Sequence, residues 1–232
     1  MEKKPFISPF SLRRHEWKVE WRVQSERPVN REMQRFTGKE ERVMQDLAVL
    51  QIITHKHLKK HYKMHEKQIQ NMLAKRLLVQ HRLIKNKETW FIYTREAIEG
   101  YKKTFVVKNY WLGYGKEEIL QRLVLVDFYF ELQRKMNTDI TLKAVAIPFQ
   151  AIFIMNDKAY EVYINRGDPH DLLVALNQSI TKERRLFIVT EQLIHLNVLA
   201  TVLERPKILY RVITDEDIYR KDKHEFFHTL PS

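Results

Sequence analysis

The pattern of apolar and polar positions is most regular over residues 54–93, where it predicts two short helices followed by a two-stranded ribbon. The second helix is expected over roughly residues 65–77, and its apolar positions fall on one face at Ile69, Met72, Leu73 and Leu77. Two β-prone runs follow at residues 79–83 and 90–93, joined by the polar residues 85–88. Two helices and a ribbon in this order are typical of a winged helix-turn-helix.

The outer face of the second helix and the tip of the ribbon carry basic and amide side chains. In the major groove of DNA, amide side chains can pair with adenine edges, whereas lysines contact phosphates. The residues expected to contact double-stranded DNA are Lys67, Gln68, Gln70, Asn71 and Lys75 on the helix, and Lys85, Asn86 and Lys87 at the tip. Gln68 belongs to this set because a shift of one residue in the helix phase would exchange it for Gln70.

One further helix and a strand are predicted before this motif, so that three helices precede the ribbon. Thr37 and Glu40 have the spacing of a capping box, and Thr54 can cap the shorter helix that follows. The buried stripe of the first helix should consist of Val43, Leu47 and Leu50. Residues 16–23 alternate polar and apolar side chains, which predicts a strand. Two roles are open for that strand: docking on one of the domains, or acting as an arm or dimerisation strand.

After residue 115 the pattern changes to one long amphipathic helix followed by mixed strands and helices. This order favours an α/β sandwich, in which helices cover a central sheet. Asp168 is expected to cap the second helix, with Pro169 at its first position, and Thr190 to cap the third. The expected elements are a helix over 116–136, strands over 141–147, 150–155 and 159–165, a helix to about 180, a strand over 186–189, a helix over 191–203 and a strand over 208–213.

Gly113 and Gly115, two of only five glycines in a chain of 232 residues, mark the expected boundary between two domains. We therefore expect an α+β protein in three parts. These are a basic arm with a strand over residues 1–36, a winged-helix DNA-binding domain over residues 37–112, and an α/β domain over residues 116–232.

The basic residues are concentrated in the first half of the chain. Up to residue 115 there are 25 Lys and Arg against 12 Asp and Glu, and beyond it 16 against 17, which accounts for the net charge of +12. The whole excess of positive charge therefore accompanies the predicted winged helix. This coincidence favours a polyanionic partner such as DNA over a domain that is basic only for solubility, or that meets an anionic membrane or an acidic protein.

Several classes of chemistry lack their characteristic residues. Without cysteine the chain has no disulfide, thiolate nucleophile or cysteine-containing zinc site, and its scattered glycines form no phosphate-binding loop. His57 and His61 have a helical spacing that can bind zinc, but no third ligand is evident, so we expect surface histidines instead. No apolar run is long enough to span a bilayer. We expect a cytoplasmic protein that has no cofactor, no metal and no membrane partner.

Two short stretches in the second half carry a resemblance to known proteins: Pro148-Phe149-Gln150-Ala151 at the second strand, and Glu161 followed by Asn165-Arg166-Gly167 at the third. The order helix, three strands, helix, strand resembles the restriction-endonuclease-like or PD-(D/E)xK core. A basic winged helix before such a core resembles the replication-relaxation family of plasmids and other mobile elements of Gram-positive bacteria. That family tends to show Pro-Asp-Ala at the second strand, and an acidic residue and then Arg-Gly at the third.

The resemblance implies a nuclease core that lacks its catalytic residues. A working core of this kind needs an acidic residue on the second strand and Glu-x-Lys on the third, because two carboxylates hold Mg²⁺ and the lysine helps to activate water. Here the second strand has no carboxylate, and the third has Glu161-Val162-Tyr163. We therefore expect no catalytic residues and no enzymatic activity.

Together these patterns predict a sequence-recognising DNA-binding protein of a plasmid, integrative element or phage. It would act as a transcriptional regulator or as an accessory factor in replication or transfer. The C-terminal domain is expected to mediate assembly into a homodimer, and a protein or a small ligand can be its partner. Two alternatives stay open: a metal-dependent DNA nicking or relaxation enzyme, and a winged-helix module that binds another protein.

Overall fold

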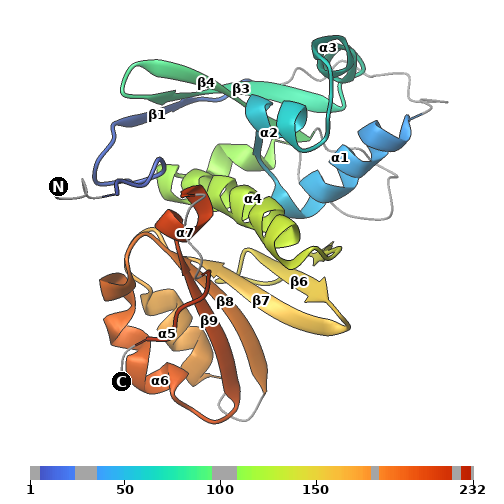
Figure 1. Cartoon of the computed structure of the whole chain (residues 1–232). Coiled ribbons are helices and arrows are strands. Elements are labelled where there is room, and N and C mark those ends of the chain that lie inside the picture. The colour runs from blue at the N-terminus through green and yellow to red at the C-terminus, as the bar shows by residue number, and fades with distance from the viewer. Residues whose placement is uncertain (1–5, 24–35, 96–108, 179–182, 221–225, 231–232) are drawn as a thin grey trace. The chain divides into compact units, whose positions relative to one another are not determined.

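The computed structural model describes residues 6–23, 36–95, 109–178, 183–220 and 226–230 (Figure 1). Within them the chain is a mixed α+β structure with two sheets, of four and five strands. It divides into two compact units: the N-terminal unit, Glu16–Ile119, and the C-terminal unit, which combines Met1–His15 with Leu120–Ser232. The arm expected over residues 1–36 therefore contributes to both units, and its residues 24–35 lie outside the described part of the chain.

The N-terminal unit combines a small sheet with helices. The sheet has the strand order β1-β3-β4-β2, and all neighbouring strands are antiparallel. In chain order the described elements are β1 (Trp17–Glu20), α1 (Gly38–Leu50), β2 (Ile53–Thr54), α2 (His55–Lys60), α3 (Glu66–Ala74), β3 (Leu78–Lys85), β4 (Glu88–Arg95) and the 3-10 turn η1 (Tyr110–Gly113).

Local side-chain contacts begin the first two helices, as the sequence predicts. Thr37 Oγ1 accepts a hydrogen bond from the Glu40 amide at 3.3 Å, and the Glu40 carboxylate accepts one from the Thr37 amide at 2.9 Å. Thr54 and His57 form the same reciprocal pair at the start of α2, at 3.1 and 3.2 Å. The predicted stripe of α1 is fully buried: Val43, Leu47 and Leu50.

Helix α3 covers Glu66–Ala74 and is therefore shorter than the predicted 65–77. It ends because Arg76 has a φ of 55°, a left-handed conformation that a right-handed helix cannot contain. Leu77 still packs in the core, at 2% exposed, but it does so from the short loop before β3.

The predicted ribbon is confirmed and is longer than expected. β3 and β4 pair without a break, from Leu78 opposite Arg95 to Lys85 opposite Glu88. Asn86 and Lys87 form the turn with φ angles of 46° and 74°. Two consecutive residues with positive φ are what a two-residue hairpin turn needs if it is to match the twist of its strands.

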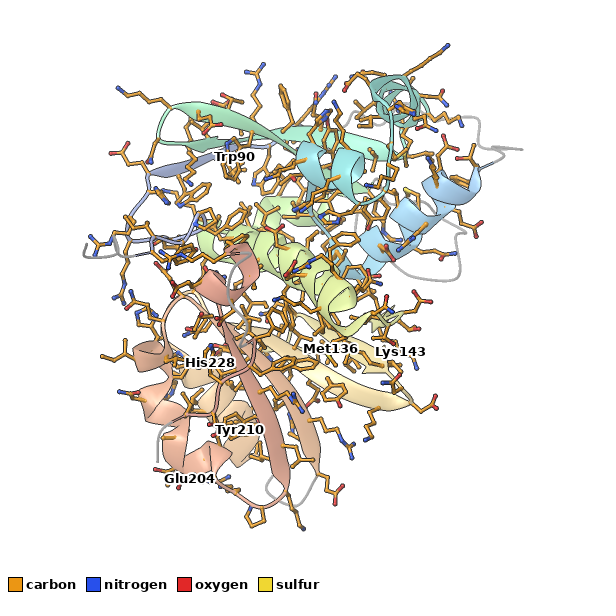
Figure 2. The ribbon with its side chains drawn as sticks, in the orientation of Figure 1. Trp90, Met136, Lys143, Glu204, Tyr210 and His228 are labelled. Carbon is orange, nitrogen blue, oxygen red and sulfur yellow. The ribbon has the colours of Figure 1, made fainter. Side chains whose placement is uncertain are left out.

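The strand predicted over residues 16–23 is confirmed in its first half, where Trp17–Glu20 pairs with β3. Trp17 is 5% exposed and packs edge-on against Trp90 of β4, with 6.0 Å between the ring centroids (Figure 2). Val23, the last apolar residue of the alternating run, is 58% exposed because it lies beyond the pairing with β3. Of the two roles left open for this strand, docking on a domain is the one that this pairing supports.

The C-terminal unit contains a mixed sheet with the strand order β5-β6-β7-β8-β9. Strands β5, β6 and β7 are antiparallel neighbours, whereas β7, β8 and β9 are parallel and are linked by helical crossovers. In chain order the described elements are α4 (Lys116–Met136), β5 (Thr141–Lys143), β6 (Ala151–Met155), β7 (Lys158–Ile164), α5 (His170–Asn177), β8 (Arg184–Thr190), the 3-10 helix η2 (Leu193–Leu199), α6 (Ala200–Leu203), β9 (Ile208–Thr214) and α7 (Asp215–Tyr219).

Apolar side chains cover both faces of this sheet. On one face the ring of Phe128, from α4, lies 5.6 Å from the rings of Phe153 and Phe187. On the other face α5, η2 and α6 contribute to a core of Phe149, Tyr163, Leu172, Leu176, Leu186, Ile188, Leu196, Leu199, Val202, Leu203 and Val212. Beyond β9 the chain returns to the sheet edge, where His228 bridges to Val212 (Figure 2). None of the described helices is long and apolar enough to cross a membrane.

Two strands of this unit differ from their predicted bounds. β5 ends at Lys143 instead of continuing to residue 147, and Ile147 is 92% exposed. The chain has left the sheet before Pro148, which has no amide hydrogen to donate to a ladder. β8 is longer than predicted because Thr190 still pairs with Thr214 of β9.

Two helices of this unit also differ from the prediction. The backbone of α5 begins at His170, with Pro169 at the N-cap position, so Asp168 does not cap it. Residues 191–203 form a 3-10 helix and then a single α-helical turn instead of one α-helix. Since Thr190 belongs to β8, its predicted role as the N-cap of that helix is wrong.

Candidate nucleic-acid interface

Helix α3 has a buried face and an exposed polar face. Ile69 and Met72 are fully buried, as their spacing predicts. Lys67, Gln70 and Asn71 are exposed on the opposite side, at the three- and four-residue spacing of one helical face. The helix phase assumed from the sequence is therefore correct for these residues.

An acidic side chain shares this part of the helix. Gln70 Nε2 donates to Glu66 Oε1 at 3.0 Å, so Gln70 is held along the helix. Glu66 Oε2 also lies 3.2 Å from His55 Nε2 at the start of α2. A protonated His55 would offset the charge of Glu66, which would otherwise repel a phosphate.

Two of the residues predicted to contact DNA, Gln68 and Lys75, instead bind other residues of the N-terminal unit. Gln68 Oε1 accepts a hydrogen bond from the His65 amide at 2.9 Å, across the first turn of α3. Lys75 Nζ lies 3.1 and 3.3 Å from the carboxylate oxygens of Glu40, whose side chain is only 4% exposed. Lys75 therefore joins the end of α3 to the start of α1 through a largely buried ion pair.

At the tip of the β3-β4 hairpin, Lys85 and Asn86 make contacts within the unit, whereas Lys87 is exposed. Lys85 Nζ lies 5.6 Å from the ring centroid of Trp17 and 5.2 Å from that of Trp90, within the range of cation–π attraction. Burial lowers the pKa of Lys85 below its usual value. Asn86 exchanges two hydrogen bonds with the backbone of Glu16, at 2.8 and 3.0 Å, and so fastens the tip to the chain before β1. Lys87 is exposed at the end of the turn.

A polar groove lies beside α3 and was not predicted. Its volume is about 380 Å³, and Gln70 lies at its margin together with Arg22, Arg76 and Gln80. The remaining lining residues are Val23, Leu73, Leu78 and Val79. Sequence reasoning could not find this groove, because it depends on the pairing of β1 with β3, and alternation predicts a strand without naming its partner.

A buried histidine anchors the base of the hairpin. His81 Nδ1 accepts a hydrogen bond from the Arg22 amide at 3.0 Å, and its Nε2 lies 2.9 Å from the hydroxyl of Thr94. The rings of Trp21 and Trp111 lie 4.9 and 5.0 Å from its ring. Burial, helped by the charge of Arg22, lowers the pKa of His81 to about 3. The imidazole is therefore neutral at physiological pH and acts as a structural hydrogen-bonding group.

The residues at the expected nuclease positions are engaged in internal contacts. Gln150 Oε1 accepts from the Ile164 amide at 2.7 Å, which joins β7 to the residue before β6. Glu161 forms an ion pair with Arg184 at 3.0 Å. The hydroxyl of Tyr163, which stands where a catalytic lysine would be, donates to Asp171 at 2.6 Å. In the part of the chain that the structure describes, no three His, Cys, Asp or Glu side chains gather as they would around a metal ion.

Of His57 and His61, the two histidines with a zinc-binding spacing, His57 caps a helix. The expectation of a surface histidine is wrong for His57, which is 4% exposed because its Nδ1 accepts a hydrogen bond from the Thr54 amide at the start of α2. The ring centroid of His61 lies 6.0 Å away. His57 therefore caps α2, a role that the sequence pattern did not indicate.

In comparisons with known proteins, no family model matches the chain, and no curated protein sequence matches it.

Proposed function

We propose that this protein binds double-stranded DNA with sequence selectivity and that its N-terminal unit acts as a winged helix-turn-helix. In this proposal α2 and α3 form the helix pair, and the β3-β4 hairpin is the wing. The exposed stripe of Lys67, Gln70 and Asn71 on α3 carries the proposal, because amide and lysine side chains on one helical face suit base readout. The excess positive charge in the same half of the chain supports it.

The dimensions of α3 suit the major groove. A helix of nine residues is about 13 Å long and about 10–12 Å wide with its side chains, and the groove is about 12 Å wide. We propose that Gln70 and Asn71 read base edges, and that Lys67 and Lys87 contact phosphates. Arg22 and Arg76, at the margin of the adjoining groove, would add positive charge beside Gln70.

The other predicted contact residues act indirectly in this proposal. Gln68 and Lys75 hold α3 in place through His65 and Glu40. Lys85 and Asn86 hold the hairpin tip through aromatic rings and the backbone before β1. Their replacement should disturb the interface by moving it, whereas replacement of Gln70 or Asn71 should change which bases are preferred.

For the C-terminal unit we propose a restriction-endonuclease-like core without catalytic activity, which serves in assembly. The elements from α4 to β8 follow the order helix, three strands, helix, strand. The pairing of Glu161 with Arg184, and of Tyr163 with Asp171, leaves little at these positions to hold Mg²⁺. Assembly into a homodimer would double the short footprint of one recognition helix.

The biological setting proposed here comes from the resemblance to the replication-relaxation family. It is a cytoplasmic transcriptional regulator, or an accessory factor in replication or transfer, of a plasmid, integrative element or phage. Mapping of bound DNA across such a genome would separate these roles. Binding upstream of a promoter indicates a regulator, and binding at an origin of replication or transfer indicates an accessory factor.

Selection of bound duplexes from a random library, followed by affinity measurements on variants, tests base readout directly. Gln70→Ala or Asn71→Ala should weaken binding to the selected site by about 1–3 kcal/mol and relax base preference, with little change on random DNA. Gln45→Ala on α1 is the matched control, because Gln45 Nε2 bonds to Glu41 at 3.1 Å as Gln70 does to Glu66. Equal losses on selected and random DNA would refute the assignment of base readers.

The alternative of a protein-binding winged helix has one observation in its favour, the acidic Glu66 beside Gln70. The two functions differ in their salt dependence. DNA binding weakens steeply with salt because counterions are released from the phosphates. A protein-binding module would show weak DNA affinity with a shallow salt slope, and that result would favour the alternative.

A further inference from the structure

A group of polar side chains lies at the carboxyl ends of the three parallel strands of the C-terminal unit. Asn165 and Arg166 follow β7, Thr190 ends β8, and Asp215 follows β9. We call these four residues the carboxyl-end cluster. In open α/β sheets, the edge formed by the carboxyl ends of the strands is the usual place for a ligand. The DNA-binding proposal makes no use of this edge.

Arg166 is the central residue of the cluster, and its hydrogen-bonding capacity is only partly used. Its side chain is 0% exposed, and Nη2 donates to Asp215 Oδ1 at 2.8 Å. Among the described residues, Nε and Nη1 are buried and have no hydrogen-bond acceptor. Buried donors on a charged group without an acceptor are rare, because desolvation is then uncompensated. Arg166 can therefore donate further hydrogen bonds, from Nε and Nη1, to an acceptor from outside the chain.

The N–H groups of Arg166 that lack an acceptor favour one that is negative, because a hydrogen bond from a charged donor to an anion is stronger than one to a neutral group. Asp215 balances the charge of Arg166 in their buried pair. Burial lowers the pKa of the neighbouring His195, and the positive charges of Arg13 and Arg166 lower it further, while Glu191 opposes them. Two arginine charges thus act on this one imidazole, and Arg13 is exposed to solvent. An oxyanion bound to Arg166 would be attracted by both arginines and repelled by the carboxylates of Asp215 and Glu191.

The N-terminal residues 6–15, which we call the covering segment, cover this edge of the sheet. The hydroxyl of Ser8 donates to Asp215 Oδ2, although the two residues are 207 positions apart. The ring of Phe10 lies 5.9 Å from that of Tyr219, and the guanidinium of Arg220 lies 5.5 Å from the ring of Phe6. The covering segment has no helix or strand. The contact from Ser8 to the cluster is made by a side chain, so a substitution can remove it without changing the backbone of the segment.

We propose that the carboxyl-end cluster binds the carboxylate or phosphate group of a small molecule, with Arg166 as the main donor and the covering segment as a removable lid. The incoming oxygen atoms accept hydrogen bonds from the free N–H groups of Arg166. The Arg166–Asp215 pair stays intact, since it uses a different nitrogen atom. The hydrogen bond from Ser8 to Asp215 keeps the lid closed, so its loss should favour binding.

Nuclear magnetic resonance of the ¹⁵N-labelled full chain tests this proposal, with inorganic phosphate and acetate as probes. Each is titrated against sodium chloride at matched ionic strength. The reporters are the Nε–H signal of Arg166, identified by its absence in Arg166→Lys, and the amides of Gly167 and Asp215. We expect saturable shifts at these positions with at least one of the two anions. Loss of one hydroxyl–carboxylate hydrogen bond in Ser8→Ala should tighten binding roughly tenfold.

Ser11→Ala is the matched control, because Ser11 lies in the same segment but its hydroxyl accepts from the Arg14 amide at 3.3 Å. It should leave the anion affinity unchanged, whereas Arg166→Lys should weaken it at least tenfold. If Arg166→Lys does not fold, the comparison of Ser8→Ala with Ser11→Ala still decides. Two results would overturn the proposal: no saturable shift in either the wild-type protein or Ser8→Ala, or shifts with duplex DNA and none with the free anions.

Discussion

The buried imidazole of His81 makes the stability of the N-terminal unit depend on pH in a way that can be calculated. Its pKa is about 3 in the folded chain, against an ordinary value of 6.5. Because the folded-state pKa is lowered, the unfolded chain binds the proton first as the pH falls. The stability contributed by neutral His81 is therefore complete above the unfolded pKa, and it is lost progressively between pH 6.5 and pH 3.

The size of this effect follows from the two pKa values. At pH 5 the unfolded histidine is almost fully protonated and the folded one almost fully neutral. The linkage relation then gives a loss of about 2 kcal/mol between pH 7.5 and pH 5. Asp46, in the same unit, acts in the opposite direction, because burial raises its pKa and protonation on acidification relieves its desolvation. A comparison of wild-type and variant chains removes this opposing contribution.

Urea unfolding followed by tryptophan fluorescence is a suitable assay. All four tryptophans of the chain lie within the N-terminal unit, so the signal reports that unit. His81→Asn provides an oxygen that can accept the Arg22 amide but does not titrate. We expect His81→Asn to be less stable than wild type at pH 7.5 and to lose about 2 kcal/mol less on going to pH 5. Gln45→Ala, at an exposed residue without a titratable group, should keep the wild-type pH dependence. The reasoning fails if wild type and His81→Asn lose the same stability between the two pH values.

Three further predictions follow from the contacts of the candidate interface. Lys75→Met should destabilise the N-terminal unit by about 1 kcal/mol, because it leaves the carboxylate of Glu40 without its cation. Urea unfolding measures this loss, and an unchanged unfolding midpoint would contradict the role of the ion pair. Lys87→Ala should weaken binding to all DNA sequences alike and reduce the salt slope by about one unit, whereas Lys158→Ala, at the exposed first residue of β7 after the β6-β7 turn, should change neither. With Mg²⁺ or Mn²⁺ the protein should not nick supercoiled plasmid; nicking that disappears in Glu161→Ala would instead support the enzyme alternative.

The features that the sequence predicted correctly are those formed by residues close together in the chain. The capping box at Thr37, the cap at Thr54, the buried face of α3 and the β3-β4 turn all arise from residues no more than a few positions apart. Periodicity and capping are determined by backbone geometry within about one helical turn or one strand pair. The sequence could therefore predict these features without knowledge of any distant contact.

Contacts between distant residues decided the rest of the candidate site. Lys75 was predicted to face DNA, yet it meets Glu40, which is 35 positions away. Asn86 bonds to Glu16 at a separation of 70 positions. Nothing in the local pattern around Lys75 or Asn86 distinguishes them from Lys67 or Lys87, which are exposed. The surrounding sequence looks the same whether a polar side chain stays in solvent or binds a distant residue.

The sequence by itself determined the three helices and the hairpin of the N-terminal unit, though not their bounds or strand β2, and it determined which face of α3 is polar and which half of the chain is basic. Only the tertiary structure decided which of the polar side chains remain exposed, and that Ser8 reaches Asp215. The physical reason is that helix and hairpin geometry follows from interactions between near neighbours, whereas the partner of a polar side chain depends on which distant segment packs against it.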